Sequence, residues 1–201
     1  MQKLKVLIPA LSLCVICLIT TLLLAGTHEI TKTAIEDQEA AASLEQKQII
    51  FPEGAEFDVV TQTADISSGL EKASGSVTEI SIAKDSSGDI LGYVFVSSSF
   101  GYAGDVVATT GISTSGEIVQ VLITAASDTP KLGKEVEKDF FSSQFSGVSA
   151  DTLTVIGTAS DDSTASIDGI SGATISSRAA SDAVNKAQNA YQYLLAEEVI
   201  Q

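Results

Sequence analysis

Four segments between residues 76 and 126 alternate apolar and polar side chains, and this period of two constrains the fold more than any other feature of the chain. The segments SVTEISIAK, ILGYVFVSS, DVVATTGIS and IVQVLITAA are rich in Val, Ile and Thr, the residue types that suit a half-buried strand. Turn sequences such as DSSGD and STSGE separate neighbouring segments. Three or four antiparallel strands with one buried face are therefore predicted.

Helical patterns follow these strands. Residues 132–145 predict an amphipathic helix, with Leu132, Val136, Phe140 and Phe141 on one face. TLTVIGTA, residues 152–159, predicts a further short strand, and residues 175–197 predict a last long helix. The expected buried side of that helix consists of Ile175, Ala179, Ala183, Ala187, Tyr191 and Leu195. The predicted class is α+β, an antiparallel sheet packed with helices.

A long apolar run lies near the N-terminus. VLIPALSLCVICLITTLLLAG, residues 6–26, contains 21 residues without a charge, and about 20 suffice for a helix to cross a bilayer. A cleaved signal peptide is the competing interpretation. A cut after residue 26 would put Leu24 at the position where small residues are preferred, and no Cys follows that would indicate lipoprotein processing. We therefore predict an uncleaved transmembrane helix.

Charge is unevenly distributed along the chain. Lys3 and Lys5 precede the apolar run, whereas the sequence after it contains 26 acidic and nine basic residues. By the positive-inside rule, the N-terminus is predicted to be cytoplasmic and the following domain extracytoplasmic. Such an acidic surface repels phosphate backbones, which argues against nucleic acid as a partner.

Cysteine and histidine are scarce. Cys14 and Cys17 form a C-x-x-C pattern inside the apolar run, where a thiolate would be costly, so we interpret them as small apolar residues of a membrane helix. The only histidine is His28. A histidine-rich metal site and a histidine general base are therefore excluded, and neither a metal ligand nor a catalytic residue is predicted.

Three parts of the chain are predicted. Residues 1–27 form the cytoplasmic N-terminus and transmembrane anchor. Residues 28–75 form a helical stalk and linker, because residues 28–51 have helical composition and Pro52 ends the helix. Residues 76–201 form the extracytoplasmic domain.

Glycines and hydroxyl residues cluster directly before the last predicted helix, in DGISGATISSR, residues 168–178. Gly172 allows left-handed backbone angles and close approach of a ligand. Ser171 is a suitable N-cap, which places Thr174 in the first helical turn. Free amides at a helix N-terminus favour anions. Neither a P-loop lysine nor the G-x-G-x-x-G spacing is present. Two interpretations stay open: an ordinary capped helix, or a phosphate held by amides and hydroxyls.

Three motifs resemble those of bacterial FMN-binding domains. DGISGAT, residues 168–174, resembles the flavinylation motif of that family; FGYAG, residues 100–104, resembles its F-G-Y-x-G turn; and SDTPKLG, residues 127–133, resembles its E-T-P-G-L-G flavin-facing loop. Their order and spacing also agree, as does the Gln144-Phe145 pair after the loop. Two residues depart from the pattern. Asp128 stands in place of Glu, and Lys131 replaces the first Gly of the loop, where its cation could face the flavin or the solvent.

The resemblance implies a set of site residues. Thr174 would be joined to FMN through a phosphoester bond made by a dedicated flavin transferase, which would recognise Asp168 and Gly169. The remaining implied FMN-binding residues are Ser171, Gly172, Ala173, Ser176, Ser177, Gly101, Tyr102, Asp128, Thr129, Leu132 and Gly133. Phe100 and Tyr102 could flank the isoalloxazine ring or pack beside the glycine turn.

Within this family the chain is similar to the G subunits of Rnf complexes, the ion-translocating ferredoxin:NAD+ oxidoreductases, and is related to the C subunits of sodium-translocating NADH:quinone reductases. The resemblance implies a single-pass protein of the cell (inner) membrane that carries electrons on covalent FMN. Its partners would be the other membrane subunits of the complex, and it would bind no small-molecule substrate independently. The alternatives are a stand-alone extracytoplasmic electron-transfer flavoprotein and a flavin-free anchored binding module.

Overall fold

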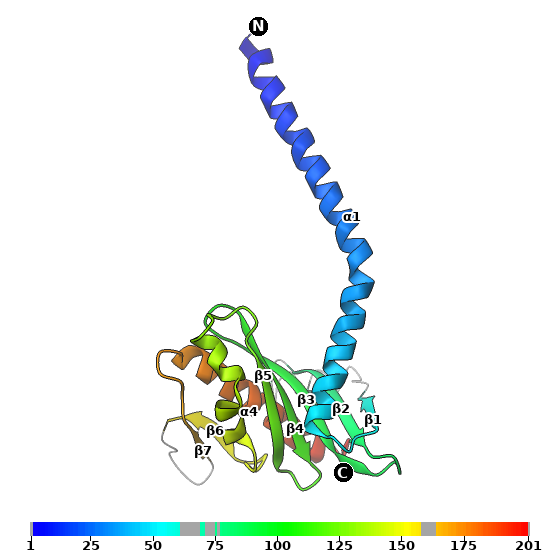
Figure 1. Ribbon diagram of the computed structural model, residues 1–201, viewed down its shortest axis with the longest axis vertical. Helices are drawn as coiled ribbons and strands as arrows, with labels where there is room; N and C mark the ends of the chain where they lie inside the picture. The colour runs from blue at the N-terminus through cyan, green and yellow to red at the C-terminus, as the bar shows by residue number, and fades with distance from the viewer. Residues whose placement is uncertain (1, 61–68, 71–74, 76, 158–163, 201) are drawn as a thin grey trace. The chain divides into compact units, whose positions relative to one another are not determined.

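The computed structural model describes residues 2–60, 69–70, 75, 77–157 and 164–200, without the side chains of residues 2–10, 28–30, 33–37 and 39 (Figure 1). The chain divides into two units, Met1–Leu44 and Glu45–Gln201. The elements are α1 (Gln2–Ile50), β1 (Glu56–Val59), β2 (Val77–Lys84), β3 (Ile90–Phe100), β4 (Asp105–Ser113), β5 (Ile118–Thr124), η1 (Gly133–Glu137), α3 (Asp139–Ser142), η2 (Ser143–Phe145), β6 (Leu153–Ile156), β7 (Thr164–Ile167) and α4 (Thr174–Ala196).

The first unit consists of the greater part of helix α1. The large apolar side chains from Leu11 to Leu24 are between 49% and 73% exposed, and Cys14 and Cys17 are free and exposed. Over the described residues, no helix combines the length and the apolar character needed to cross a bilayer. The side chains of residues 6–10, which belong to the predicted anchor, lie outside the described part. The helix ends at Ile50, close to Pro52 as predicted.

The second unit contains a five-stranded sheet in the order β1-β2-β3-β4-β5. Every neighbouring pair is antiparallel, so the prediction of alternating antiparallel strands is confirmed for β2 to β5. Strand β1 was not predicted. It pairs Glu56 with Lys84 and Val59 with Ser81 at the edge of the sheet, and its four residues are too few to show a clear period.

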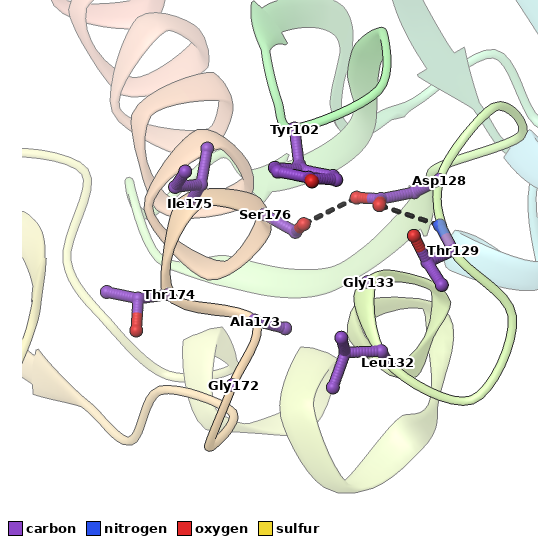
Figure 2. A pocket seen from close by; sticks show the side chains of 10 residues that line it. All are labelled: Tyr102, Asp128, Thr129, Leu132, Gly133, Gly172, Ala173, Thr174, Ile175 and Ser176. Atoms are coloured by element: carbon purple, nitrogen blue, oxygen red, sulfur yellow. Dashed lines mark hydrogen bonds between the residues drawn. The ribbon is translucent and has the colours of Figure 1, made fainter.

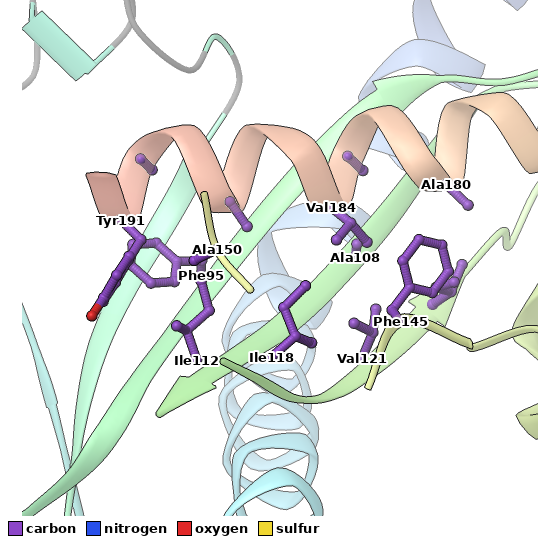
Figure 3. Packing of buried hydrophobic residues seen from close by; sticks show 14 of the residues in the cluster. Phe95, Ala108, Ile112, Ile118, Val121, Phe145, Ala150, Ala180, Val184 and Tyr191 are labelled. Atoms are coloured by element: carbon purple, nitrogen blue, oxygen red, sulfur yellow. The ribbon is translucent and has the colours of Figure 1, made fainter. Parts of the chain in front are cut away.

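Helix α4 packs across one face of this sheet (Figure 3). The fully buried Ala180, Ala183 and Ala187 carry small side chains, which allow the helix backbone to approach the strands closely. The strands and the neighbouring turns contribute larger side chains to the same core, among them Tyr93, Phe95, Ile112, Ile118, Val121 and Phe145.

The predicted buried side of α4 is correct in its middle and wrong at both ends. Ala179, Ala183, Ala187 and Tyr191 are buried. Ile175 is 55% exposed because it borders cavities instead of strands. Leu195 is 42% exposed because Leu194, one position earlier, takes the buried place.

The opposite face of the sheet is covered by the last turn of α1. Ile50 and Phe51 form a second small cluster with Ala83 and Val94. In the same turn, Lys47 forms a largely buried ion pair with Glu79, and Thr109 Oγ1 donates a hydrogen bond to Gln46 Oε1 (3.0 Å). This turn thus covers part of the second face, around Ala83 and Val94.

The single helix predicted over residues 132–145 is wrong. Three short turns, η1, α3 and η2, replace it, because Lys138 has an extended backbone (φ −85°, ψ 148°) that interrupts the helical hydrogen bonds. Val136 and Phe141 are fully buried, whereas Phe140 is 58% exposed. Phe141 packs edge-on against Phe145, with ring centroids 5.6 Å apart. Burial of these two rings determines where the segment bends.

A second sheet of two parallel strands, β6 and β7, leads into the last helix. Strand β6 was predicted from residues 152–159, of which 158–159 lie outside the described residues; β7 was not predicted. Thr154 connects β6 to α4: its N–H donates to Asn185 Oδ1 (2.7 Å), and its carbonyl accepts from Ser181 Oγ and Asn185 Nδ2 (both 2.9 Å). These contacts hold the middle of α4 beside the small sheet.

Candidate cofactor site

A cavity of about 570 Å³ opens at the N-terminal end of α4 (Figure 2). Three separate segments of the chain line it: the turn between β3 and β4, the loop after β5, and the turn that leads into α4. Its lining residues are Tyr102, Asp128, Thr129, Leu132, Gly133, Gly172, Ala173, Thr174, Ile175 and Ser176. A volume of several hundred Å³ is typical of cofactor sites.

The chain enters α4 through a tight turn. Ala173 N–H donates to the Ile170 carbonyl (3.0 Å), and Gly172, with a φ of 82°, occupies the position of a type II turn that favours glycine. Ser177 Oγ accepts from Ile170 N–H and donates to the Ala173 carbonyl, both at 3.0 Å. Since Ser177 is fully buried, its hydroxyl fixes the turn to the helix and does not line the cavity.

Helix α4 begins at Thr174, and its N-cap is Ala173. The expectation that Ser171 caps the helix is therefore wrong: the turn places Ser171 two residues before the cap position, where its side chain is exposed. Ala173 offers no capping side chain, and the first turn contains no acidic residue. The first helical hydrogen bond is donated by Ser177 N–H to the Ala173 carbonyl (2.9 Å). The preceding amides of the first turn carry the positive end of the helix dipole.

Gln144 holds the segment that precedes this turn. Its Oε1 accepts from Asp168 N–H (2.7 Å) and its Nε2 donates to the Asp168 carbonyl (3.3 Å). The Asp168 side chain remains exposed. The sequence indicates Gln144 only through the order of the motifs, because a side-chain amide gives no sign of the backbone groups that it will contact.

Asp128 forms a buried polar contact at the edge of the cavity, and only 6% of its surface is exposed. Its Oδ1 accepts from Thr129 N–H (2.7 Å), and its Oδ2 accepts a hydrogen bond from Ser176 Oγ (Figure 2). Gly133 lies against the same carboxylate, so closely that a Cβ there would be 2.1 Å from Oδ1. Residues from two different motifs thus contact one another directly.

Lys131 occupies the position at which the resemblance expected glycine. Its φ of 62° lies in the left-handed region, which glycine adopts without strain and other residues adopt at a cost. Its side chain is exposed, and the residue does not line the cavity. The loop therefore keeps the glycine conformation although the glycine is absent.

Other residues named from the sequence lie around the cavity. Gly101 is buried and does not line the cavity, and its N–H donates to the Gly104 carbonyl (2.8 Å). Tyr102 lines the cavity and is 66% exposed, whereas Phe100, 76% exposed, lines a second cavity of about 630 Å³. The structure therefore does not bring both aromatic side chains to one cavity. Ile175, expected in the core, lines both cavities.

Sequence profiles of two protein families match this chain. The profile of the FMN-binding domain matches residues 101–189, a range that contains every residue lining the first cavity. The profile of the RnfG N-terminal region matches residues 1–46. The class defined by fold and site is therefore that of FMN-binding domain proteins.

Two relatives of similar length identify the family to which the chain belongs within this class. The G subunit of the Na(+)-translocating ferredoxin:NAD(+) oxidoreductase complex of Acetobacterium woodii is 33% identical over 190 residues, with 92% of this chain and 90% of that protein covered. The G subunit of the ion-translocating oxidoreductase complex of Methanosarcina acetivorans is 31% identical, with 92% of each chain covered. The chain belongs to this family of Rnf complex G subunits.

Solved structures share the fold. The C subunit of the Na(+)-translocating NADH-quinone reductase from Parabacteroides distasonis superposes with a TM-score of 0.51 over 70% of this chain and 78% of that chain, at 18% identity. NqrC of Shewanella oneidensis superposes with a TM-score of 0.52 over 75% and 86%, at 15% identity. The α+β architecture is thus that of these two proteins.

Proposed function

We propose that this chain is an electron-carrying subunit of a membrane-bound, ion-translocating ferredoxin:NAD+ oxidoreductase complex, and that it carries FMN bound covalently to Thr174. The observation that carries the proposal is the convergence of three motifs on one cavity, at a helix N-terminus without a capping side chain and with Thr174 as its first residue. The names of the relatives from Acetobacterium woodii and Clostridium ljungdahlii, both G subunits of ferredoxin:NAD(+) oxidoreductase complexes, support the assignment to such a complex.

The residues of the site fit an FMN group. Thr174 offers an exposed hydroxyl for a phosphoester, and the amides of the first turn of α4 stabilise the remaining charge of the phosphate. Tyr102 presents an exposed ring at the edge of the cavity, where a flat isoalloxazine can stack. Bound FMN supplies the electron-transfer chemistry, so the side chains are required only to hold and orient it.

The exposed turn also suits enzymatic attachment. Asp168, Gly169, Ser171 and Thr174 are all exposed, so a flavin transferase can reach the acceptor and the residues before it. Gln144 and Ser177 fix the backbone of this segment by accepting hydrogen bonds from Asp168 N–H and Ile170 N–H. We propose that this combination of a rigid backbone and exposed side chains presents Thr174 to the transferase.

We further propose that residues 1–27 anchor the protein in the cell (inner) membrane with the N-terminus in the cytoplasm, that α1 continues from residue 28 as a stalk up to Leu44, after which the second unit begins, and that residues 76–201 lie outside the cytoplasm. The exposed apolar side chains of α1 between Leu11 and Leu24 support this proposal. Thr20 and Thr21 donate their hydroxyls to carbonyls one turn earlier (3.0 and 2.7 Å), so neither hydroxyl would face lipid as an unpaired donor. The other subunits of the complex would be the partners.

Substitution of Thr174 by valine tests the covalent link. The full-length chain is co-expressed with a flavin transferase, and intact-protein mass spectrometry is followed by peptide mapping. The wild-type chain should gain the mass of FMN less one water on the peptide that contains Thr174, and Thr174→Val should gain nothing. Thr174→Ser, which keeps a hydroxyl, is the matched control and should retain modification. Covalent flavin on the valine variant, or an unmodified wild type beside an active transferase, contradicts the proposal.

A further inference from the structure

The acceptor threonine and the only arginine of the chain lie on the same side of α4. Thr174 and Arg178 are four residues apart in this helix, so their Cβ atoms are neighbours at roughly 5–6 Å. A guanidinium on its three-carbon stem can therefore reach a phosphate esterified to Thr174 Oγ1. Arginine binds phosphate through two parallel hydrogen bonds, which a lysine cannot form.

A second cavity adjoins this side of the helix. Its volume is about 630 Å³, and Ile175, Arg178, Ala179 and Asp182 line it from α4. The side chains of Thr174 and Ser176 leave the helix in different directions, and Ser176 points to the Asp128 carboxylate (Figure 2). Ile175 lines both cavities, so the start of α4 separates them.

Arg178 is exposed and lies one turn after the start of α4. A cation so near a helix N-terminus faces the positive end of the helix dipole, which is unfavourable. The first turn of α4 has no acidic residue. Asp182, one turn after Arg178, accepts from Ser99 Oγ (2.6 Å) and pairs with Lys186 (3.3 Å). Among the described ion pairs, none involves Arg178. A bound anion would remove this imbalance.

We propose that Arg178 binds the phosphate of the flavin nucleotide at Thr174, an inference that rests on the proposed function. The Arg178 guanidinium and the amides of the first turn of α4 would together hold the phosphate. The exposed ring of Tyr102 marks the first cavity as the place of the isoalloxazine.

The test uses the full-length chain without flavin and inorganic phosphate as the probe. The melting temperature is measured against phosphate concentration at constant ionic strength for the wild type, Arg178→Gln, Arg178→Lys and Lys84→Gln. The last variant loses the same charge at a partly exposed ion pair with Asp58 and is the matched control. The fit of these melting temperatures gives the phosphate midpoint, the phosphate concentration at which half of the folded chains bind phosphate. We expect this midpoint to rise about tenfold in Arg178→Gln, to rise less in Arg178→Lys, and to stay unchanged in Lys84→Gln. The rate of flavin attachment, followed by mass spectrometry, should fall in Arg178→Gln by a similar factor.

The outcomes separate this inference from the proposed function. Wild-type flavinylation with equal phosphate midpoints in wild type and Arg178→Gln overturns the role of Arg178 and leaves the flavin assignment intact. A slower attachment rate with an unchanged midpoint also overturns it, because Arg178 would then act on the transferase. An Arg178-dependent phosphate midpoint in a chain that is never flavinylated supports the anion site and contradicts the flavin assignment. Equal midpoint shifts in Arg178→Gln and Lys84→Gln show a general charge effect and overturn the inference.

Discussion

Replacement of Gly133 by alanine should destabilise the domain, although such a replacement is usually favourable. Gly133 does not adopt a left-handed φ, so alanine would ordinarily add about 0.4–1 kcal/mol by reducing the entropy of the unfolded chain. The new Cβ, however, would lie 2.1 Å from Asp128 Oδ1 and 2.3 Å from Oδ2. Carbon and oxygen atoms cannot approach so closely, so the buried carboxylate must move.

The cost follows from the contacts that Asp128 would lose. Its carboxylate accepts hydrogen bonds from Thr129 N–H and Ser176 Oγ, and each bond to a charged group contributes about 1.5–3 kcal/mol. The adjoining cavity lets water replace part of this, so we expect a net loss of about 2–4 kcal/mol in the free energy of unfolding. For a domain of this size, each kcal/mol lowers the melting temperature by roughly 2–4 °C.

A double-mutant cycle identifies the mechanism. Urea unfolding is followed by circular dichroism for the wild type, Gly133→Ala, Ser176→Ala and the double variant. If alanine acts by moving Asp128, the Ser176 bond is already lost in Gly133→Ala, and the double variant should be less destabilised than the sum of the single variants. A Gly133→Ala protein as stable as the wild type, or strictly additive free energies, would refute the reasoning.

Two further perturbations test the backbone and the core. Lys131→Gly should stabilise the protein by up to about 1 kcal/mol. Lysine at a φ of 62° costs about 1–2 kcal/mol, and the greater freedom of glycine in the unfolded chain offsets roughly 0.5–1 kcal/mol of the gain. Lys131→Ala keeps the Cβ and should gain nothing, so equal unfolding midpoints for the two variants would show that the loop is unstrained. Burial, with a smaller contribution from Tyr93, raises the pKa of Tyr191 above its ordinary value of 10.0. The unfolded chain therefore ionises at a lower pH than the folded chain. The contribution of the protonated Tyr191 to stability is fully present below pH 10.0, and the unfolding free energy falls as the pH rises from 10.0 towards the folded pKa. Tyr191→Phe should show a shallower alkaline loss of unfolding free energy in urea titrations, and identical slopes for the two proteins would contradict the effect of burial.

Local patterns in the sequence were sufficient for most of the sheet and for the long helices. Strands β2 to β5 each contain enough residues for a period of two to be recognised, and alternation reflects one buried face per strand. The alanine spacing of α4 likewise predicted Ala179, Ala183 and Ala187 as its buried side. The short strands β1 and β7 have four residues each, and their pairing depends on neighbours far along the chain or across the segment 158–163.

The candidate site was predicted as a set of residues, and its internal contacts were not. Motif order named most of the residues that line the cavity, but no pattern indicates that Ser176 donates to Asp128 or that Gln144 holds the backbone of Asp168. Polar side chains of these types occur at many positions, and their partners are chosen by three-dimensional proximity. The same holds for Arg178, whose relation to Thr174 requires α4 to begin where it does.

Tertiary packing decided the remaining features. The apolar spacing of residues 132–145 suits a helix, yet burial of Phe141 and Phe145 against the core, with an extended Lys138, divides the segment into three turns. The start of α4 at Thr174 depends on a turn held by the buried hydroxyl of Ser177 and not on the side chain of Ser171. Periodicity reports which side of an element is apolar. Where an element ends, and which side its neighbours leave open, is set by contacts between residues distant in sequence, because the burial of those residues outweighs local propensity.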